Sequence, residues 1–212
     1  MSILNLFSNI FTELKVFFST LPLFKLLQLP FYPQDPDAER KFVSKHKLSE
    51  SEFSKWIDSA CGMFCLKMIL KKKLNKEFSV IDLVDDSMKF GTYKILEDGK
   101  LSAMVYEPFA KFIKNKFGLG SKVCRFLSMR RIKYELSKDN FVIASVHWDI
   151  KDQLRNPPFK GGHLVVITGY SEKERCFFIN NPTGIKNISQ VNYKITYNNF
   201  KKFFARRGII VQ

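Results

Sequence analysis

The stretch Ser59-Ala60-Cys61-Gly62, continued by MFCLKMIL at residues 63–70, is the most apolar helical pattern in the chain. Its apolar side chains cover most of a helix surface, which predicts a largely buried helix from Cys61 to Leu74. Cys61 would lie in the first turn, where unpaired backbone N–H groups and the helix dipole favour a thiolate and lower the cysteine pKa. Cys61 is therefore either a nucleophile or a small buried residue, as we expect for Cys65, Cys124 and Cys176.

A glycine turn followed by an apolar strand supplies a candidate base. Residues 161–170 read GGHLVVITGY, so His163 begins a strand directly after two glycines. The glycines leave room beside the imidazole, and the strand would hold the ring rigidly beside a cleft. His147, after the next strand upstream, is the competing candidate. His46 lies in a lysine-rich polar segment, where we expect it to be solvated.

An amide follows the next predicted strand. Asn181-Pro182 comes directly after the strand predicted over residues 175–180. Because that strand would neighbour the histidine strand, Asn181 would fix the tautomer and orientation of His163, the third role in a Cys–His–Asn arrangement. The same dipeptide also suits a simple turn.

Helical patterns precede strand patterns along the chain. Helices are predicted over residues 49–56, 61–74, 79–91, 108–118 and 128–136, with a last one over 198–206. Strands are predicted over residues 123–127, 141–148, 163–170, 175–180 and 208–211. This order predicts an α+β fold with a buried helix packed on an antiparallel sheet. The proline-rich stretch 22–36 predicts a boundary, with an appendage at 1–28 and a main domain at 29–212.

Composition narrows the class of protein. The 212 residues are 45% hydrophobic and carry 35 Lys+Arg against 20 Asp+Glu, a net charge of +15. Such a charge favours anionic partners, but there is no zinc-finger spacing or RNA-binding aromatic signature, so we expect no specific nucleic-acid binding. Four cysteines are too few for a disulfide scaffold, and no apolar run is long enough to span a bilayer.

The first 21 residues predict an amphipathic helix that Pro22 ends. Its apolar residues recur at spacings of three and four: Ile3, Leu6, Phe7, Ile10, Leu14, Phe17, Phe18 and Leu21. We expect the helix either to pack on its own domain or to lie on a membrane or a partner.

Four segments together resemble the papain-like cysteine peptidases, and more narrowly the bacteriocin-processing peptidases that cut after a double glycine, with their stand-alone relatives. These segments are LPFYPQ at residues 29–34, ACG at 60–62 with LKMIL at 66–70, GHLVVITGY at 162–170 and INNP at 179–182. The resemblance covers roughly residues 29–212 and implies a papain-like cysteine peptidase fold.

The resemblance also implies a role for each matching residue. Cys61 would be the nucleophile, His163 the base and then the acid, and Asn181 the residue that orients His163. Gln34 would supply an oxyanion-hole donor together with the Cys61 backbone N–H. This chain departs from the family at Asn181, where relatives usually carry Asp, and in the long separation of Gln34 from Cys61, which makes 36–56 an insertion. Asp58 or a backbone donor is the alternative to Gln34.

The sequence therefore predicts a thiol-dependent peptidase that needs no metal or cofactor and acts on a peptide or protein. A thiolate requires reducing conditions, so we expect a cytoplasmic protein, with membrane or partner contact through residues 1–28. Three alternatives stay open: a non-catalytic peptide-binding relative of the same fold, a transamidase or deamidase with the same triad, and a membrane-surface protein.

Overall fold

The computed structural model describes residues 3–40 and 48–212, with side chains from residue 11 onward. Its helices are α1 (Ile3–Phe18), α2 (Pro36–Glu39), α3 (Glu50–Ser59), α4 (Cys61–Leu74), α5 (Val80–Met88), α6 (Tyr106–Phe117), α7 (Met129–Ser137) and α8 (Tyr197–Phe203), with a 3₁₀ turn at Trp148–Lys151. Its strands are β1 (Phe24–Leu26), β2 (Ser121–Cys124), β3 (Phe141–Val146), β4 (His163–Ser171), β5 (Cys176–Asn180), β6 (Tyr193–Thr196) and β7 (Phe204–Val211).

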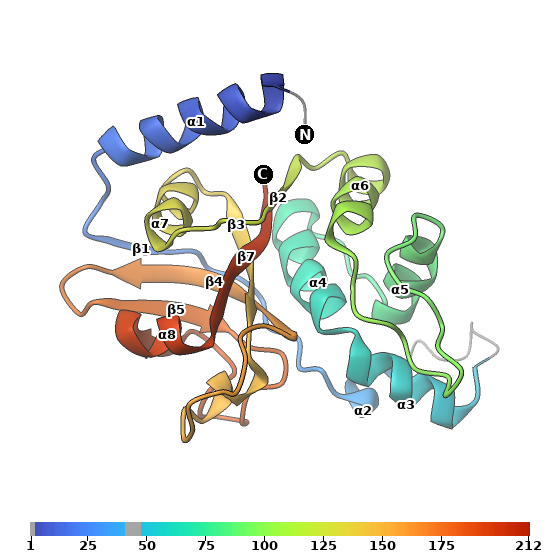
Figure 1. The fold of residues 1–212 in the computed structure, drawn as a ribbon. Coiled ribbons are helices and arrows are strands. Elements are labelled where there is room, and N and C mark those ends of the chain that lie inside the picture. Colours follow the sequence, from blue (N-terminus) through green and yellow to red (C-terminus); the bar gives the residue numbers. More distant parts are fainter. Residues whose placement is uncertain (1–2, 41–47) are drawn as a thin grey trace.

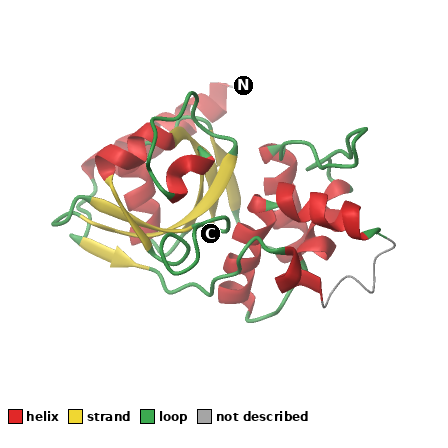
Figure 2. Ribbon diagram, turned by 90° about the horizontal axis from the view of Figure 1, so that it is seen from below, coloured by secondary structure: helices red, strands yellow, loops and turns green. Residues whose placement is uncertain are grey.

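The strands form one antiparallel sheet in the order β2-β7-β3-β4-β5-β6, and β1 also pairs with β4. Every residue of β3 and β4 is buried, because both strands lie in the middle of the sheet. Helices α3 to α6 form a second body beside the sheet, and the two bodies lie next to each other in two perpendicular views (Figures 1 and 2). The mixed α+β class predicted from the sequence is confirmed.

Helix α4 joins the two bodies. It packs against β4 and β3 on one side and against α5 on the other, and residues 62–70 are all buried. Ser49 and Glu52 form a capping box at the start of α3, and Ala60 alone separates the end of α3 from the start of α4. The position of Cys61 therefore depends on the junction between α3 and α4.

One charged side chain of α4 is buried. Lys67 is 2% exposed and pairs with the carboxylate of Glu39, whose other oxygen accepts a hydrogen bond from the backbone N–H of Val80 at 3.0 Å. The Lys67 ammonium also lies 4.5 Å from the ring centroid of Tyr32. These contacts connect α2, the start of α5 and the extended segment around Tyr32 to α4.

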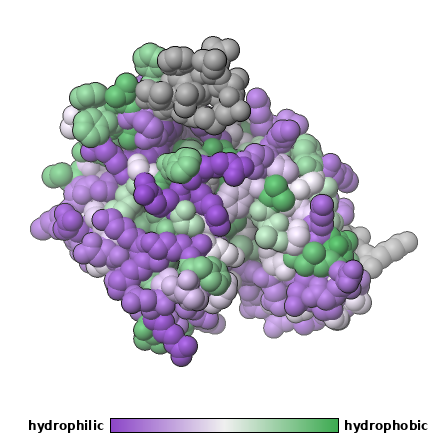
Figure 3. Space-filling model, viewed as in Figure 1, coloured by the Kyte–Doolittle hydropathy of each residue, from purple (hydrophilic) through white to green (hydrophobic). Residues whose placement is uncertain are grey.

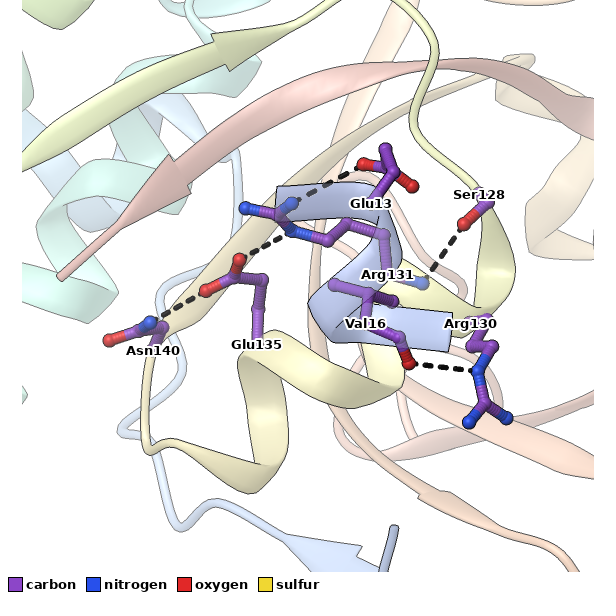
Figure 4. A network of polar contacts seen from close by, with 7 residues as sticks. All are labelled: Glu13, Val16, Ser128, Arg130, Arg131, Glu135 and Asn140. Carbon is purple, nitrogen blue, oxygen red and sulfur yellow. Dashed lines mark hydrogen bonds and ion pairs between the residues drawn. The ribbon is translucent and has the colours of Figure 1, made fainter. Parts of the chain in front are cut away.

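Helix α1 packs on α7 through polar contacts. Arg131 reaches both Glu13 of α1 and Glu135 of its own helix, and Asn140 donates to the second oxygen of Glu135 (Figure 4). Arg130 donates to the backbone oxygens of Val16, Phe17 and Ser19, which closes the C-terminal end of α1.

The other side of α1 is apolar and exposed. Phe11, Leu14 and Phe18 lie three and four residues apart and are 71%, 49% and 78% exposed, whereas Val16 is buried. Figure 3 shows apolar side chains over α1 next to strongly hydrophilic ones. The predicted helix packs on its own domain, and contact of residues 1–28 with a membrane or partner stays a prediction.

Several predicted boundaries are corrected. The last helix ends at Phe203, and the last strand begins at Phe204, so Arg206 lies in a strand and not in the helix. The strand predicted over 123–127 is formed by Ser121–Cys124, and the short strands β1 and β6 had not been predicted. Strand β1 belongs to the predicted appendage yet pairs with β4, while the boundary at residue 29 stays a prediction. Part of the expected insertion, with His46, lies outside the described residues.

Candidate active site

Cys61 is the first residue of α4, and its sulfur lies against the start of β4. The helix has no side-chain cap at Ala60, so backbone N–H groups of its first turn stay near the thiol. Backbone hydrogen bonds from Leu164 and Gly62 act to lower the pKa of Cys61, but burial of the sulfur outweighs them and raises that pKa to about 11. The pKa shift is thus opposite to the one expected from the helix N-terminus, because desolvation of the thiolate is the larger effect.

His163 is the first residue of β4 and directly precedes Leu164. It is 5% exposed, and its Nε2 lies 2.8 Å from the side-chain oxygen of Asn181. Burial lowers the pKa of His163 to about 4, against the opposing effect of the Asn181 hydrogen bond. The imidazole is therefore neutral at physiological pH, and with its Nε2 proton directed to Asn181 its Nδ1 is left as the proton acceptor.

Asn181 follows β5 directly, and its side-chain oxygen is an acceptor shared by several donors. The backbone N–H of Thr183 donates to that oxygen at 3.2 Å, which closes an Asx turn and supports its assignment as oxygen. The predicted turn and the predicted orienting role are therefore compatible. The Nδ2 of Asn181 is buried and has no hydrogen-bond partner among the described residues.

Thr183 is a further site residue that sequence reasoning missed. Its hydroxyl lies 3.1 Å from His163 Nε2 and 3.3 Å from the Asn181 oxygen. An Asn-Pro-Thr run does carry a signal for it, since a residue two positions after Asn is the usual donor in an Asx turn.

Two consecutive glycines precede His163 for a backbone reason. Gly161 and Gly162 have φ angles of +100° and +94°, a region that residues with a Cβ rarely adopt. A Cβ at Gly162 would also lie 3.2 Å from the ring of Trp148. The turn therefore requires glycine to bring His163 to the start of β4.

Gln34 lies near these residues, but both of its amide hydrogens are used. Its Nε2 donates to the backbone oxygens of Ile57 and Asp58 at 2.8 Å each, and its backbone N–H donates to the oxygen of Pro182 at 2.9 Å. Gln34 thus connects the end of α3, just before Cys61, with the turn that holds Asn181. Its Oε1 is buried without a partner among the described residues.

His147, the competing base, lies in an aromatic cluster. Its Nδ1 accepts the backbone N–H of Asp149 at 3.3 Å, and its ring lies 4.1 Å from that of Trp148 and 4.8 Å from that of Phe159. Of the two candidate bases, His163 is the one that contacts Asn181 and directly precedes Leu164, whose backbone hydrogen-bonds Cys61.

A groove of about 450 Å³ opens beside Cys61. Its lining includes Gly162 and Leu164 on either side of His163, Met104 from the loop before α6, Tyr106 at the start of α6, and Arg207 from β7. A Cβ at Gly62 would lie 2.3 Å from Met104 Cε and 2.9 Å from Leu164 Cδ1, so these two lining residues pack directly against Gly62.

Other chemistry finds little support in the described part of the chain. Within it no group of three or more His, Cys, Asp and Glu side chains is placed to hold a metal ion. The four cysteines are free thiols, of which Cys124 is partly exposed and so corrects the prediction of a buried residue. Over the same residues, no helix combines the length and apolar character needed to cross a bilayer.

A helix-borne cysteine beside a sheet-borne histidine and its amide partner, in an α+β fold, places the protein in the papain-like cysteine peptidase fold class. The chain belongs to the Peptidase_C39 like family, whose model matches residues 39–209. The match confirms the resemblance drawn from the sequence, at the level of a cysteine peptidase family.

Solved structures agree on the fold. A C39-like peptidase from Bacillus anthracis matches with a TM-score of 0.55 at 13% identity, over 89% of this chain and 97% of the other. Xylellain, a cysteine protease from Xylella fastidiosa, matches with a TM-score of 0.41 at 14% identity, over 91% of this chain and 87% of the other. No curated protein matches the chain.

Proposed function

We propose that the protein is a cysteine peptidase in which Cys61, His163 and Asn181 form the catalytic triad. The observation that carries the proposal is the 2.8 Å contact between His163 Nε2 and the Asn181 oxygen, beside the backbone of Leu164 that hydrogen-bonds Cys61. Membership of a cysteine peptidase family supports the same roles.

The pKa shifts favour a neutral thiol and a neutral imidazole in the resting enzyme. His163 would accept the thiol proton while the Cys61 sulfur attacks the substrate carbonyl carbon, so that charge develops only in the transition state. The protonated His163 would then donate to the leaving amine as the C–N bond breaks and a thioester remains. Water, deprotonated by His163, would hydrolyse the thioester and release the carboxylic acid and the Cys61 thiol.

The oxyanion would form at the start of α4, near backbone N–H groups. The N–H of Cys61 is one proposed donor. Gln34 is the other, provided that its Nε2 turns away from the Ile57 and Asp58 oxygens when substrate binds. The groove beside Cys61 supports a peptide or protein substrate, and the resemblance of the sequence to the double-glycine peptidases supports cleavage after a Gly-Gly pair.

Two related functions remain as candidates because of specific observations. The raised pKa of Cys61 and the lowered pKa of His163 favour a non-catalytic peptide-binding protein. A thioester accepts an amine as well as water, so transamidation uses the same residues.

Free cysteines would suit a reducing compartment such as the cytoplasm, which we propose as the location.

The test is cleavage of a peptide library with and without Gly-Gly sites, followed by mass spectrometry, for the wild type and for Cys61→Ala and His163→Gln. Cleavage that both substitutions abolish, and that Cys124→Ala leaves unchanged, supports the peptidase. Cleavage that persists in Cys61→Ala overturns it. Adding a primary amine separates the alternatives, since a transamidase forms amide products in place of acids, and a binding protein forms neither.

A further inference from the structure

Arg207 is brought into the groove by a bulge in β7. Ala144 of β3 pairs with Gly208 and Val146 pairs with Phe204, so the single residue Ser145 faces three residues of β7. The backbone of the bulge is in an unusual conformation, because Arg206 has a φ of +55°. A hydrogen bond of 2.7 Å from Leu127 N–H to the Arg206 oxygen holds it in place. Bulges of this kind redirect side chains beside active sites.

The bulge places the Arg207 guanidinium next to the turn that carries His163. An atom added as a Cβ to Gly161 would lie 2.8 Å from Arg207 Nη2, so glycine leaves the space that the guanidinium occupies. Arg207 also lines the groove together with Cys61 and Gly162. A positive charge therefore stands at the same groove as the nucleophile.

The guanidinium of Arg207 has no carboxylate within ion-pair distance in the part of the chain that the structure describes. The second arginine of the groove, Arg125, differs in this respect, because it pairs with Glu107. Apart from Arg207, the atoms nearest to a Cβ added at Gly161 belong to Ser145 and Ala205, which carry no charge, and the buried Oγ of Ser145 has no hydrogen-bond partner among the described residues. The groove thus contains one arginine whose charge is not neutralised.

We infer that the groove selects peptides with an Asp or Glu side chain close to the scissile bond, and that Arg207 binds this carboxylate; the inference rests on the proposed peptidase function. A guanidinium matches a carboxylate with two parallel N–H···O hydrogen bonds, which gives geometric selection as well as attraction. The net charge of +15 adds a general attraction for acidic peptides. Substrate choice then depends on an acidic side chain that binds Arg207.

The test compares Arg207→Gln with Arg206→Gln, its neighbour in the same bulge, which is exposed but does not line the groove. The first readout does not need peptidase activity: it is the ratio of Cys61 alkylation rates with iodoacetate and iodoacetamide. We expect this ratio to fall about fivefold in Arg207→Gln and to stay unchanged in Arg206→Gln. An equal ratio in the wild type and Arg207→Gln overturns the inference.

The second readout is binding of acetyl-Asp-Gly-Gly-amide and of its Asn twin to the Cys61→Ala protein, followed by NMR. The Asp peptide should bind more tightly, and the difference should disappear with Arg207→Gln. Equal binding of the two peptides contradicts a subsite for an acidic side chain. This readout decides the question even if Cys61 reacts with neither iodoacetate nor iodoacetamide. If no peptide is cleaved but the Asp peptide still binds more tightly, the proposed peptidase function is wrong and the subsite at Arg207 is retained. Failure of the proposed function and failure of this inference therefore give different results.

Discussion

His163 Nε2 and the side-chain oxygen of Asn181 lie 2.8 Å apart at one end of two neighbouring strands, β4 and β5. Because β4 and β5 are hydrogen-bonded to each other, the ladder between them holds this distance. Cys61 belongs to another element, and its distance from the imidazole depends on how α4 packs on the sheet. The two halves of the proposed triad therefore respond to different substitutions.

Asn181→Asp should activate the thiol. A carboxylate beside His163 stabilises the imidazolium and raises its pKa, and the imidazolium in turn stabilises the Cys61 thiolate. The buried Nδ2 without a partner is removed by the same change. We expect the pH profile of Cys61 alkylation by iodoacetamide to move to lower pH by about one unit or more. Asn187→Asp, on the exposed part of the same loop, is the matched control, and an unchanged profile in Asn181→Asp contradicts the proposed orientation of His163.

His163→Gln should change how stability depends on pH. The pKa of His163 is about 4 in the folded protein and 6.5 in its ordinary state, so the unfolded chain binds more protons between these pH values. The free energy of unfolding should therefore fall by about 3 kcal/mol as the pH drops from 6.5 to 4, at 1.36 kcal/mol per pKa unit. Urea titrations of both proteins give the difference. Parallel pH curves for wild type and variant show that the imidazole is not buried in the neutral form.

Gln34→Ala should lower stability through the α3–α4 junction. The substitution removes the donors to the Ile57 and Asp58 oxygens, and one unpaired buried acceptor costs about 1–3 kcal/mol. If Gln34 also contributes to the oxyanion hole, kcat falls by about 100-fold at a temperature where the variant is fully folded. Thermal unfolding and kcat, measured on the same samples, separate the two roles. A loss of stability with unchanged kcat restricts Gln34 to a structural role.

Substitution of either partner of the buried ion pair should be strongly destabilising. Lys67→Met leaves the Glu39 carboxylate buried without its ammonium partner, and Glu39→Gln removes the nearer of the two carboxylates that pair with Lys67, the other being Glu77 at 3.6 Å. Each change should reduce the free energy of unfolding by about 3–5 kcal/mol, and the double variant by less than the sum. A double-mutant cycle in urea measures the coupling. Additive effects contradict a direct interaction.

Arg130→Ala should release the C-terminal end of α1. The guanidinium donates to three backbone oxygens there, and no other side chain described makes these contacts. We expect faster limited proteolysis between α1 and β1, with the rest of the chain protected, and Lys138→Ala, at the opposite end of α7, as the control.

Flotation with liposomes of the full chain and of a variant with Phe11, Leu14 and Phe18 changed to Ser tests the membrane contact predicted for residues 1–28. Equal flotation excludes the exposed stripe as the contact.

Most of the site could be predicted from the sequence because its residues stand at element boundaries that have local signals. Cys61 begins an apolar helix, His163 follows two glycines, and Asn181 precedes a proline. Thr183 was missed because its contacts depend on the Asx turn, and the pKa of Cys61 was predicted in the wrong direction because burial is a tertiary property. The end of α8 was also predicted wrongly, because the bulge in β7 that follows it is fixed by pairing with β3 and by Leu127, which are far away in sequence.

The proposed site residues fall into two groups along the chain, so a single cut between the groups would separate them. Gln34 and Cys61 precede the exposed turn at Gly118, which ends α6, and His163 and Asn181 follow it. A protein cut at that turn would give one fragment with Cys61 and a second fragment with His163 and Asn181. Alkylation of Cys61 that depends on His163 would then measure the fraction of fragments that have reassociated.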